Sequence, residues 1–170
     1  MESSGRQARL NTLFLKMIAF DAGDPKRIQH FVKVHSFAKL IGESERLDAD
    51  SLYTLEAAAY LHDIGIRIGE EKYGRNDGKI QEQEGPEPAG TLMRECGFEE
   101  SVISRVQYLI AHHHTYRNIE GADYQILVEA DFLVNLYEDG ASPTAVKTAG
   151  ENIFRTETGT KILREMFGTK

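Results

Sequence analysis

The sequence predicts an all-α fold, and three observations indicate this class. Apolar residues recur at spacings of three and four through most of the chain, which is the period of an amphipathic helix. The chain contains only four prolines, and no two alternating apolar and polar runs are joined by a hairpin turn. Its 170 residues match the usual size of one domain with its own core. We therefore expect residues 1–170 to form a single compact helical bundle.

The first three predicted helices have clear start or stop signals. The first carries an apolar stripe that ends near the sequence DAGDP: Leu10, Leu13, Phe14, Met17 and Ile18. Asp24 is placed to cap the second helix, and Pro25 suits its first turn. This helix is expected to end at Gly42, and a third helix is predicted from Ser51 to Asp63.

The middle of the chain is expected to be less regular. Residues 64–88 contain five glycines and few apolar anchors, which is typical of an irregular segment at the rim of a site. The remaining predicted helices lie at about 87–96, 100–114 and 123–138, with two short ones within 142–168.

Charge and cysteine content limit the kinds of partner. The chain has 27 acidic and 20 basic residues, a net charge of −7, which argues against nucleic acid or an anionic membrane as the main partner. Cys96 is the only cysteine, so no internal disulfide can form and a reducing cytoplasm is expected. Neither a signal peptide nor an apolar run long enough to span a bilayer is evident. The oligomeric state is left open, and a homodimer is compatible with the sequence.

Two titratable residues end the apolar third helix, in the sequence AAAYLHDIG. His62 and Asp63 offer an imidazole nitrogen and a carboxylate oxygen, a donor set that suits Mn, Fe, Co, Ni or Zn better than Ca or Mg. Adjacent residues point about 100° apart on a helix, but at a helix end they can converge on one ion. Gly65 then lets the chain turn away.

Helix periodicity distinguishes two histidines on the preceding helix. Val34, Ala38 and Ile41 form one apolar face, and His30 lies one turn before Val34 on that face. His35 lies about 140° around the helix from His30, so His30 is the better candidate ligand. Arg27 lies on the same side as His30 and could contact a substrate anion or pair with a carboxylate.

Further candidate ligands lie on two later helices. Asp131 is embedded in the apolar sequence ILVEADFLVN, where a carboxylate is unfavourable unless it is paired or metal-bound. Asn135, one turn later, could orient Asp131 or touch a substrate. The sequence QYLIAHHHTY places three consecutive histidines at a helix end, and one or two of them could reach a site.

The order His, His-Asp, Asp on successive helices resembles the HD-domain superfamily of metal-dependent phosphohydrolases. The matching segments are RIQHFVKVHSFAKLIG, AAAYLHDIG and VEADFLV, within about residues 25–137. The resemblance implies an HD-type bundle and one or two divalent transition metal ions. The first ion would be held by four ligands: His30, His62, Asp63 and Asp131.

The match to the second metal site of the superfamily is partial. The segment QEQEGPEPAGTLM holds Glu84 and Gly85 where a histidine ligand is common in the family. Glu84 could serve as a carboxylate ligand in its place, and His112 or His113 would be the other ligand.

The resemblance implies a metal-dependent phosphohydrolase of the cytoplasm, acting on a small phosphate ester or nucleotide through metal-activated water. Asp63, as a bridging ligand, and Arg27, as a cation beside the phosphate, are the expected catalytic residues. Lys79 and Arg67 could also contact phosphate, although surface charge explains them adequately. One alternative is a di-iron oxygenase that cleaves a C–C or C–P bond, and another is a non-catalytic ligand-binding domain.

Overall fold

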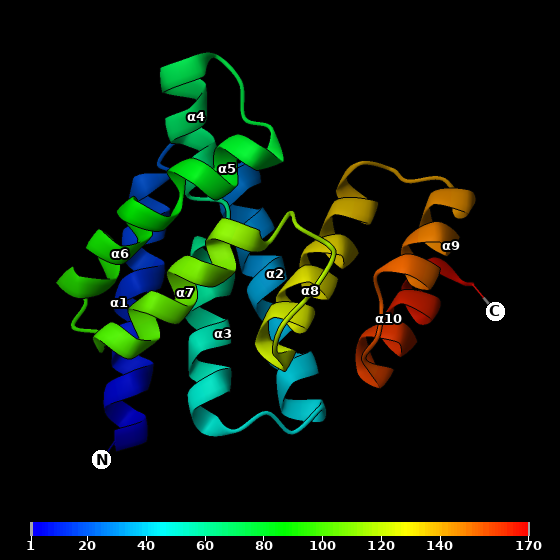
Figure 1. The fold of residues 1–170 in the computed structure, drawn as a ribbon, viewed down its shortest axis with the longest axis horizontal. Helices are drawn as coiled ribbons and strands as arrows, with labels where there is room; N and C mark the ends of the chain where they lie inside the picture. The colour runs from blue at the N-terminus through cyan, green and yellow to red at the C-terminus, as the bar shows by residue number, and fades with distance from the viewer. Residues whose placement is uncertain (1, 170) are drawn as a thin grey trace.

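The computed structural model describes residues 2–169, which form ten α-helices and no β-strand (Figure 1). The helices are α1 (Glu2–Phe20), α2 (Pro25–Ser44), α3 (Ala49–Leu61), α4 (Gly65–Tyr73), α5 (Gly78–Glu84), α6 (Pro86–Glu95), α7 (Glu100–His112), α8 (Ala122–Glu138), α9 (Pro143–Asn152) and α10 (Glu157–Phe167). The predicted all-α class is therefore confirmed.

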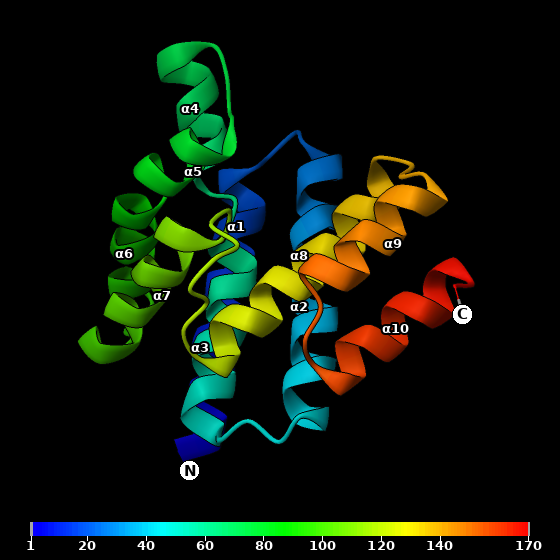
Figure 2. The same ribbon diagram turned by 45° about the vertical axis from the view of Figure 1, so that its right-hand side comes forward.

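Three helices form the centre of the bundle. Helices α2, α3 and α8 pack against one another, and α1 and α7 pack against α3. Helices α4 and α5 form a pair that rises above this centre, and α6 lies along α7 (Figure 1). Helices α9 and α10 lie beside α8, away from α6 and α7 (Figure 2). The C-terminal end of α3 is thus enclosed by α2, α7 and α8.

The start signals read from the sequence act as expected. The Asp24 carboxylate accepts a hydrogen bond of 3.0 Å from the backbone amide of Arg27, and Pro25 is the first residue of α2. Helix α2 continues two residues past Gly42 to Ser44. Asp48 caps α3, which begins two residues before the predicted Ser51.

The prediction of an irregular segment at residues 64–88 is wrong, because most of it is helical. Two glycines explain the difference. A Cβ atom on Gly65 would lie 2.7 Å from the carbonyl oxygen of Gln81 and 3.0 Å from the backbone nitrogen of Gly85. The glycines therefore let two backbones approach closely, and they do not mark a loop.

Small side chains bring the central helices together. Ala57, Ala58 and Ala59 of α3 are fully buried in one continuous apolar cluster that includes α1, α2, α7 and α8.

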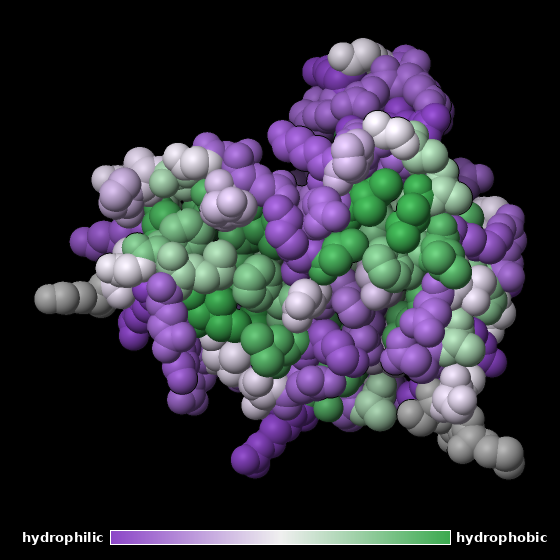
Figure 3. Space-filling model, turned by 180° about the vertical axis from the view of Figure 1, so that it is seen from behind, coloured by the Kyte–Doolittle hydropathy of each residue, from purple (hydrophilic) through white to green (hydrophobic). Residues whose placement is uncertain are grey.

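On the face opposite that of Figure 1, apolar side chains gather in two areas separated by a polar band (Figure 3). Some apolar residues on this face are therefore exposed at the molecular surface. None of the helices formed by residues 2–169 combines the length and the apolar content that a bilayer crossing requires.

Glu129 fixes the C-terminal helices to α8. Its side chain is fully buried and points away from the neighbouring Asp131. One carboxylate oxygen accepts hydrogen bonds from the backbone amides of Arg155 at 2.7 Å and Thr156 at 2.9 Å, and the other accepts one from the Thr156 hydroxyl at 2.5 Å. This buried carboxylate is therefore satisfied by the turn that precedes α10.

A Gly159→Ala substitution should disrupt this attachment. The added Cβ would lie 2.0 Å from the Glu129 Oε2 atom, so the carboxylate must move and lose hydrogen bonds. We expect the free energy of unfolding, measured by urea denaturation, to fall by about 2–4 kcal/mol. Gly5→Ala is the matched control, because a Cβ on this helical glycine meets nothing within 4 Å. Equal stability of the two variants would contradict the role given to Glu129.

Candidate metal centre

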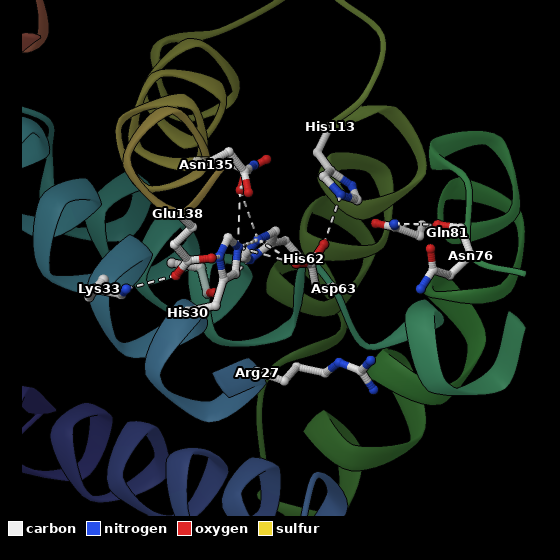
Figure 4. Close-up of polar contacts among 12 residues, drawn as sticks. Arg27, His30, Lys33, His62, Asp63, Asn76, Gln81, His113, Asn135 and Glu138 are labelled. Carbon is white, nitrogen blue, oxygen red and sulfur yellow. Dashed lines mark hydrogen bonds and ion pairs between the residues drawn. The ribbon is translucent and has the colours of Figure 1, made fainter. Parts of the chain in front are cut away.

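Four side chains from three parts of the fold converge at the end of α3. The Nε2 atom of His30 lies 3.3 Å from His62 Nε2, 3.2 Å from Asp63 Oδ2 and 3.2 Å from Asp131 Oδ1 (Figure 4). His62 Nε2 lies 3.4 Å from the same two carboxylate oxygens. His30, His62 and Asp131 are buried, and the Asp63 side chain is 16% exposed. The structure therefore brings together the four residues that the sequence selects.

Hydrogen bonds set which ring nitrogen of each histidine faces the cluster. His30 Nδ1 lies 3.0 Å from Glu138 Oε2, and His62 Nδ1 lies 2.8 Å from the backbone oxygen of Ala59. Both partners are acceptors, so each Nδ1 carries a hydrogen, and in the neutral form of each ring Nε2 turns a lone pair inward. Lys33 pairs with the other oxygen of Glu138 at 2.7 Å and holds that carboxylate in place.

The donor atoms fit one transition metal ion. Ligands about 2.1 Å from a tetrahedrally coordinated ion lie about 3.4 Å from one another. Each imidazole Nε2 atom lies 3.2–3.4 Å from the other donor atoms, which matches this spacing. The donor atoms of His30, His62 and Asp63 all lie within 4.8 Å of one another, and Asp131 joins them through its contacts with the two imidazoles. Two imidazole lone pairs that face each other at 3.3 Å require a proton or a cation between them. A neutral-imidazole and carboxylate donor set suits an ion such as Mn²⁺, Co²⁺ or Zn²⁺.

The electrostatics of the cluster also favour a bound cation. Burial lowers the pKa of His30, but hydrogen bonds to Asp131 and Asp63 outweigh burial and raise this pKa to about 10. Burial raises the pKa of Asp131, but the hydrogen bonds with His30 and His62 outweigh it and hold this pKa well below its usual range. Positive charge is therefore stabilised at this point, and a metal ion would displace the protons.

Comparisons with known proteins agree with this geometry. Residues 27–164 match the family model of the HD domain. The chain belongs to the HD-domain superfamily. It is also similar to a solved structure from an uncultured Thermotogales bacterium, described as a predicted HD superfamily hydrolase, with a TM-score of 0.63 and 28% sequence identity. That match covers 95% of this chain and 84% of the other. No curated protein matches.

The second oxygen of Asp63 in this HD-domain chain faces His113. Asp63 Oδ1 lies 3.5 Å from His113 Nε2, a fully buried atom without a hydrogen-bond partner among the described residues. His113 Nδ1 lies 2.8 Å from the backbone oxygen of Ile110, so its Nε2 atom also has a free lone pair. His112 lies elsewhere, because its Nδ1 atom bonds the Tyr108 carbonyl at 2.7 Å and its ring stacks on that of Tyr108. The structure thus brings His113, and not His112, to the HD cluster.

Glu84 is not brought to the cluster either. Its carboxylate accepts hydrogen bonds from Lys72 at 2.6 Å and from the Tyr73 hydroxyl at 2.8 Å. These partners belong to α4, so Glu84 joins α5 to α4. Glu84 was expected as a ligand because it stands where a histidine ligand is common in the family, but its side chain is directed to α4 instead.

The two histidines of α2 are separated as the helix period predicts. His35 Nε2 bonds Glu56 at 3.0 Å, and its ring stacks on Tyr60 with centroids 4.1 Å apart. Asn135 donates a hydrogen bond of 2.9 Å to Asp131 Oδ1 and so orients this carboxylate.

Figure 4 draws Arg27 below Asp63, with no hydrogen bond or ion pair between the two residues. Its guanidinium lies 3.3 Å from Glu70 and 3.6 Å from Asp24, distances that indicate weak pairing. Arg27 also lines a cavity of about 320 Å³ between the α1–α2 turn and α4. Arg67 lines the same cavity and donates to the backbone oxygen of Phe20, while Lys79 is exposed.

Sequence reasoning missed Glu138, the outer partner of His30. Asp131, Asn135 and Glu138 are spaced by four and three residues, so they share one face of α8. This spacing was a readable signal, because metal-binding histidines usually donate their second ring hydrogen to a carboxylate or carbonyl.

Asp21 was also missed, and its environment leads to a prediction. It is 3% exposed, and its Oδ1 atom has no hydrogen-bond partner in the described part of the chain. Burial raises the pKa of Asp21 to about 6 from 3.8, although the charges of Arg27 and Arg67 oppose this. The Asp24 and Asp63 carboxylates add to the increase. Ionised Asp21 is therefore unfavourable in the folded chain at neutral pH.

An Asp21→Asn variant should be more stable than the wild-type chain. Because the folded pKa is raised, the charge begins to oppose folding above pH 3.8 and does so fully above about pH 6. We expect a gain of about 1–2 kcal/mol at pH 7.5 that disappears near pH 4, measured by urea denaturation at both values. A loss of stability at pH 7.5 would mean that the Asp21 carboxylate has a stabilising partner.

Proposed function

We propose that the chain is a metal-dependent phosphohydrolase that acts on a small phosphate ester or a nucleotide through metal-activated water. The observation that carries the proposal is the buried cluster of two imidazole Nε2 atoms and two carboxylates at 3.2–3.4 Å. Hydrolase activity is also the description of the similar Thermotogales protein. The net charge of −7 supports a small substrate over nucleic acid or an anionic membrane. The single cysteine, Cys96, is in keeping with a protein of the reducing cytoplasm.

Each residue near the cluster has a proposed part in this chemistry. His30, His62, Asp63 and Asp131 would hold the ion, which lowers the pKa of water and polarises a phosphoryl oxygen when it is bound. His113 offers an unpartnered acceptor atom, Nε2, that can receive a hydrogen bond from the attacking water. Arg27, only weakly paired with Glu70, can turn to a phosphate oxygen and neutralise its charge.

A screen of metal-free protein tests the proposal. The chain is stripped with a chelator, reloaded separately with Mn²⁺, Fe²⁺, Co²⁺, Ni²⁺ or Zn²⁺, and assayed for phosphate release from nucleotides and sugar phosphates. We expect metal-dependent release from some of these substrates and none from single-stranded oligonucleotides.

Other outcomes would favour the alternatives. Oxygen uptake that depends on two bound irons, without phosphate release, would favour an HD-type oxygenase. Failure to bind any divalent ion would favour a non-catalytic domain.

A further inference from the structure

Two histidines, His113 and His114, lie near the Asp63 oxygen that faces away from His30, and they raise the question of a second ion. Donor atoms of Asp63, His113 and His114 all lie within 4.8 Å of one another. The rings of His113 and His114 are adjacent, with centroids 4.0 Å apart. Three such donors could hold a cation if each had a free lone pair.

Both ring nitrogens of His114 already have hydrogen-bond partners. His114 Nε2 lies 2.8 Å from the Gln81 side-chain oxygen, and His114 Nδ1 lies 3.2 Å from the Tyr116 hydroxyl. His113 differs, because its Nε2 atom has no partner among the described residues. Both ring nitrogens of His114 are therefore hydrogen-bonded, whereas His113 has one ring nitrogen without a partner among the described residues.

The orientation of the Gln81 amide decides the tautomer of His114. Gln81 Nε2 donates a hydrogen bond of 2.7 Å to the backbone oxygen of Asn76 (Figure 4). The Gln81 oxygen must then face His114 as an acceptor, so His114 Nε2 carries the hydrogen. The remaining lone pair, on Nδ1, accepts the hydrogen of the Tyr116 hydroxyl. No lone pair of His114 is left for a cation.

The surrounding contacts prevent His114 from turning freely. Glu82 accepts hydrogen bonds from the backbone amide of His114 at 3.0 Å and from the Thr115 hydroxyl at 2.9 Å. A Cβ atom on Gly78 would lie 2.8 Å from the His114 ring, so α5 packs directly on it. Gln81 is itself buried, with 8% of its surface exposed, and its hydrogen bond to Asn76 fixes the side chain that faces His114.

We infer that this chain binds one divalent ion tightly, and that Gln81 excludes a tight second ion by keeping His114 in a tautomer that cannot coordinate. Within residues 2–169, Asp63 Oδ1 and His113 Nε2 are then the two side-chain donors left for a second ion on this side of Asp63, fewer than the three or four of a stable site. The inference rests on the metal cluster of the proposed function and fixes its number of ions.

Manganese stoichiometry tests the inference without an activity assay. The full chain is loaded with Mn²⁺ and dialysed, its metal content is measured, and electron paramagnetic resonance reports whether two ions are coupled through Asp63. We expect one uncoupled Mn²⁺ per wild-type chain, with a second binding at least about 100-fold more weakly. Gln81→Leu should free His114 and retain a second, coupled Mn²⁺, and Gln81→Leu with His114→Ala should return to one.

Each remaining outcome separates this inference from the proposed function. Two tightly bound, coupled ions in the wild-type chain would overturn the inference and leave the first metal site intact. A folded Gln81→Leu variant that retains one ion would overturn the role of Gln81. His114→Ala alone should still hold one ion, and loss of that ion would show that His114 is a ligand. No bound Mn²⁺ in the wild-type chain would remove the metal site and this inference together.

Discussion

An Asp63→Asn variant is expected to release phosphate at least about 10³-fold more slowly than the wild-type chain, because it loses both charge and metal affinity. The Asp63 carboxylate faces His30 at 3.2 Å, His62 at 3.4 Å and His113 at 3.5 Å. Among residues 2–169 it is the carboxylate that contacts His30, His62 and His113 together. The rate of phosphate release and the metal content after dialysis measure the effect.

The control for this prediction is Asp139→Asn. Asp139 is exposed at the end of α8, so the same chemical change there should leave the rate of phosphate release and the metal content unchanged. Circular dichroism shows whether Asp63→Asn remains folded. A folded Asp63→Asn variant with normal metal content and an unchanged rate would remove Asp63 from the site.

A His30→Ala and His35→Ala pair should separate metal binding from packing on one helix. His30→Ala removes a neutral donor and leaves two carboxylates and one imidazole, so we expect metal affinity at least about 100-fold lower. His35→Ala leaves the buried Glu56 with Lys39 as its hydrogen-bond partner. We expect this variant to keep its metal and to lose about 1–3 kcal/mol of stability.

Calorimetric titration with Mn²⁺ and urea denaturation, carried out on both variants, measure these effects. The reverse result, with metal lost from His35→Ala and retained in His30→Ala, would show that the helix face was assigned wrongly. If both folded variants lost the metal, the metal site would depend on the packing of α2 in general, and the loss could not be assigned to His30 as a ligand.

The parts of the site that could be predicted lie on long, regular helices. On α2 the buried positions Val34, Ala38 and Ile41 share a face with His30, so a period of 3.6 residues placed that side chain without knowledge of the neighbouring helices. Asp131 stood out because a lone carboxylate within an apolar helix needs a partner. Both signals are local in sequence.

The errors arose where local sequence does not determine geometry. Glycines at Gly65 and Gly85 resemble those of a loop, and only the packed α4–α5–α6 segment shows that they permit close contact between backbones. Three consecutive histidines at the end of α7 do not show by helix periodicity which of them faces the site. The structure ends α7 at His112 and shows that His113, and not His112, faces Asp63. Glu84 was proposed from its place in the partial family match, and a family position alone did not show that Lys72 and Tyr73 would bind its carboxylate.

The central claim is that one divalent ion binds between α2, the end of α3 and α8, and anomalous diffraction from crystals grown with Mn²⁺ or Co²⁺ tests it most directly. We predict one strong anomalous peak, about 2.1 Å from His30 Nε2, His62 Nε2, Asp63 and Asp131. A structure in which these four side chains keep their positions without a peak between them, or in which the ion lies elsewhere, would contradict the claim.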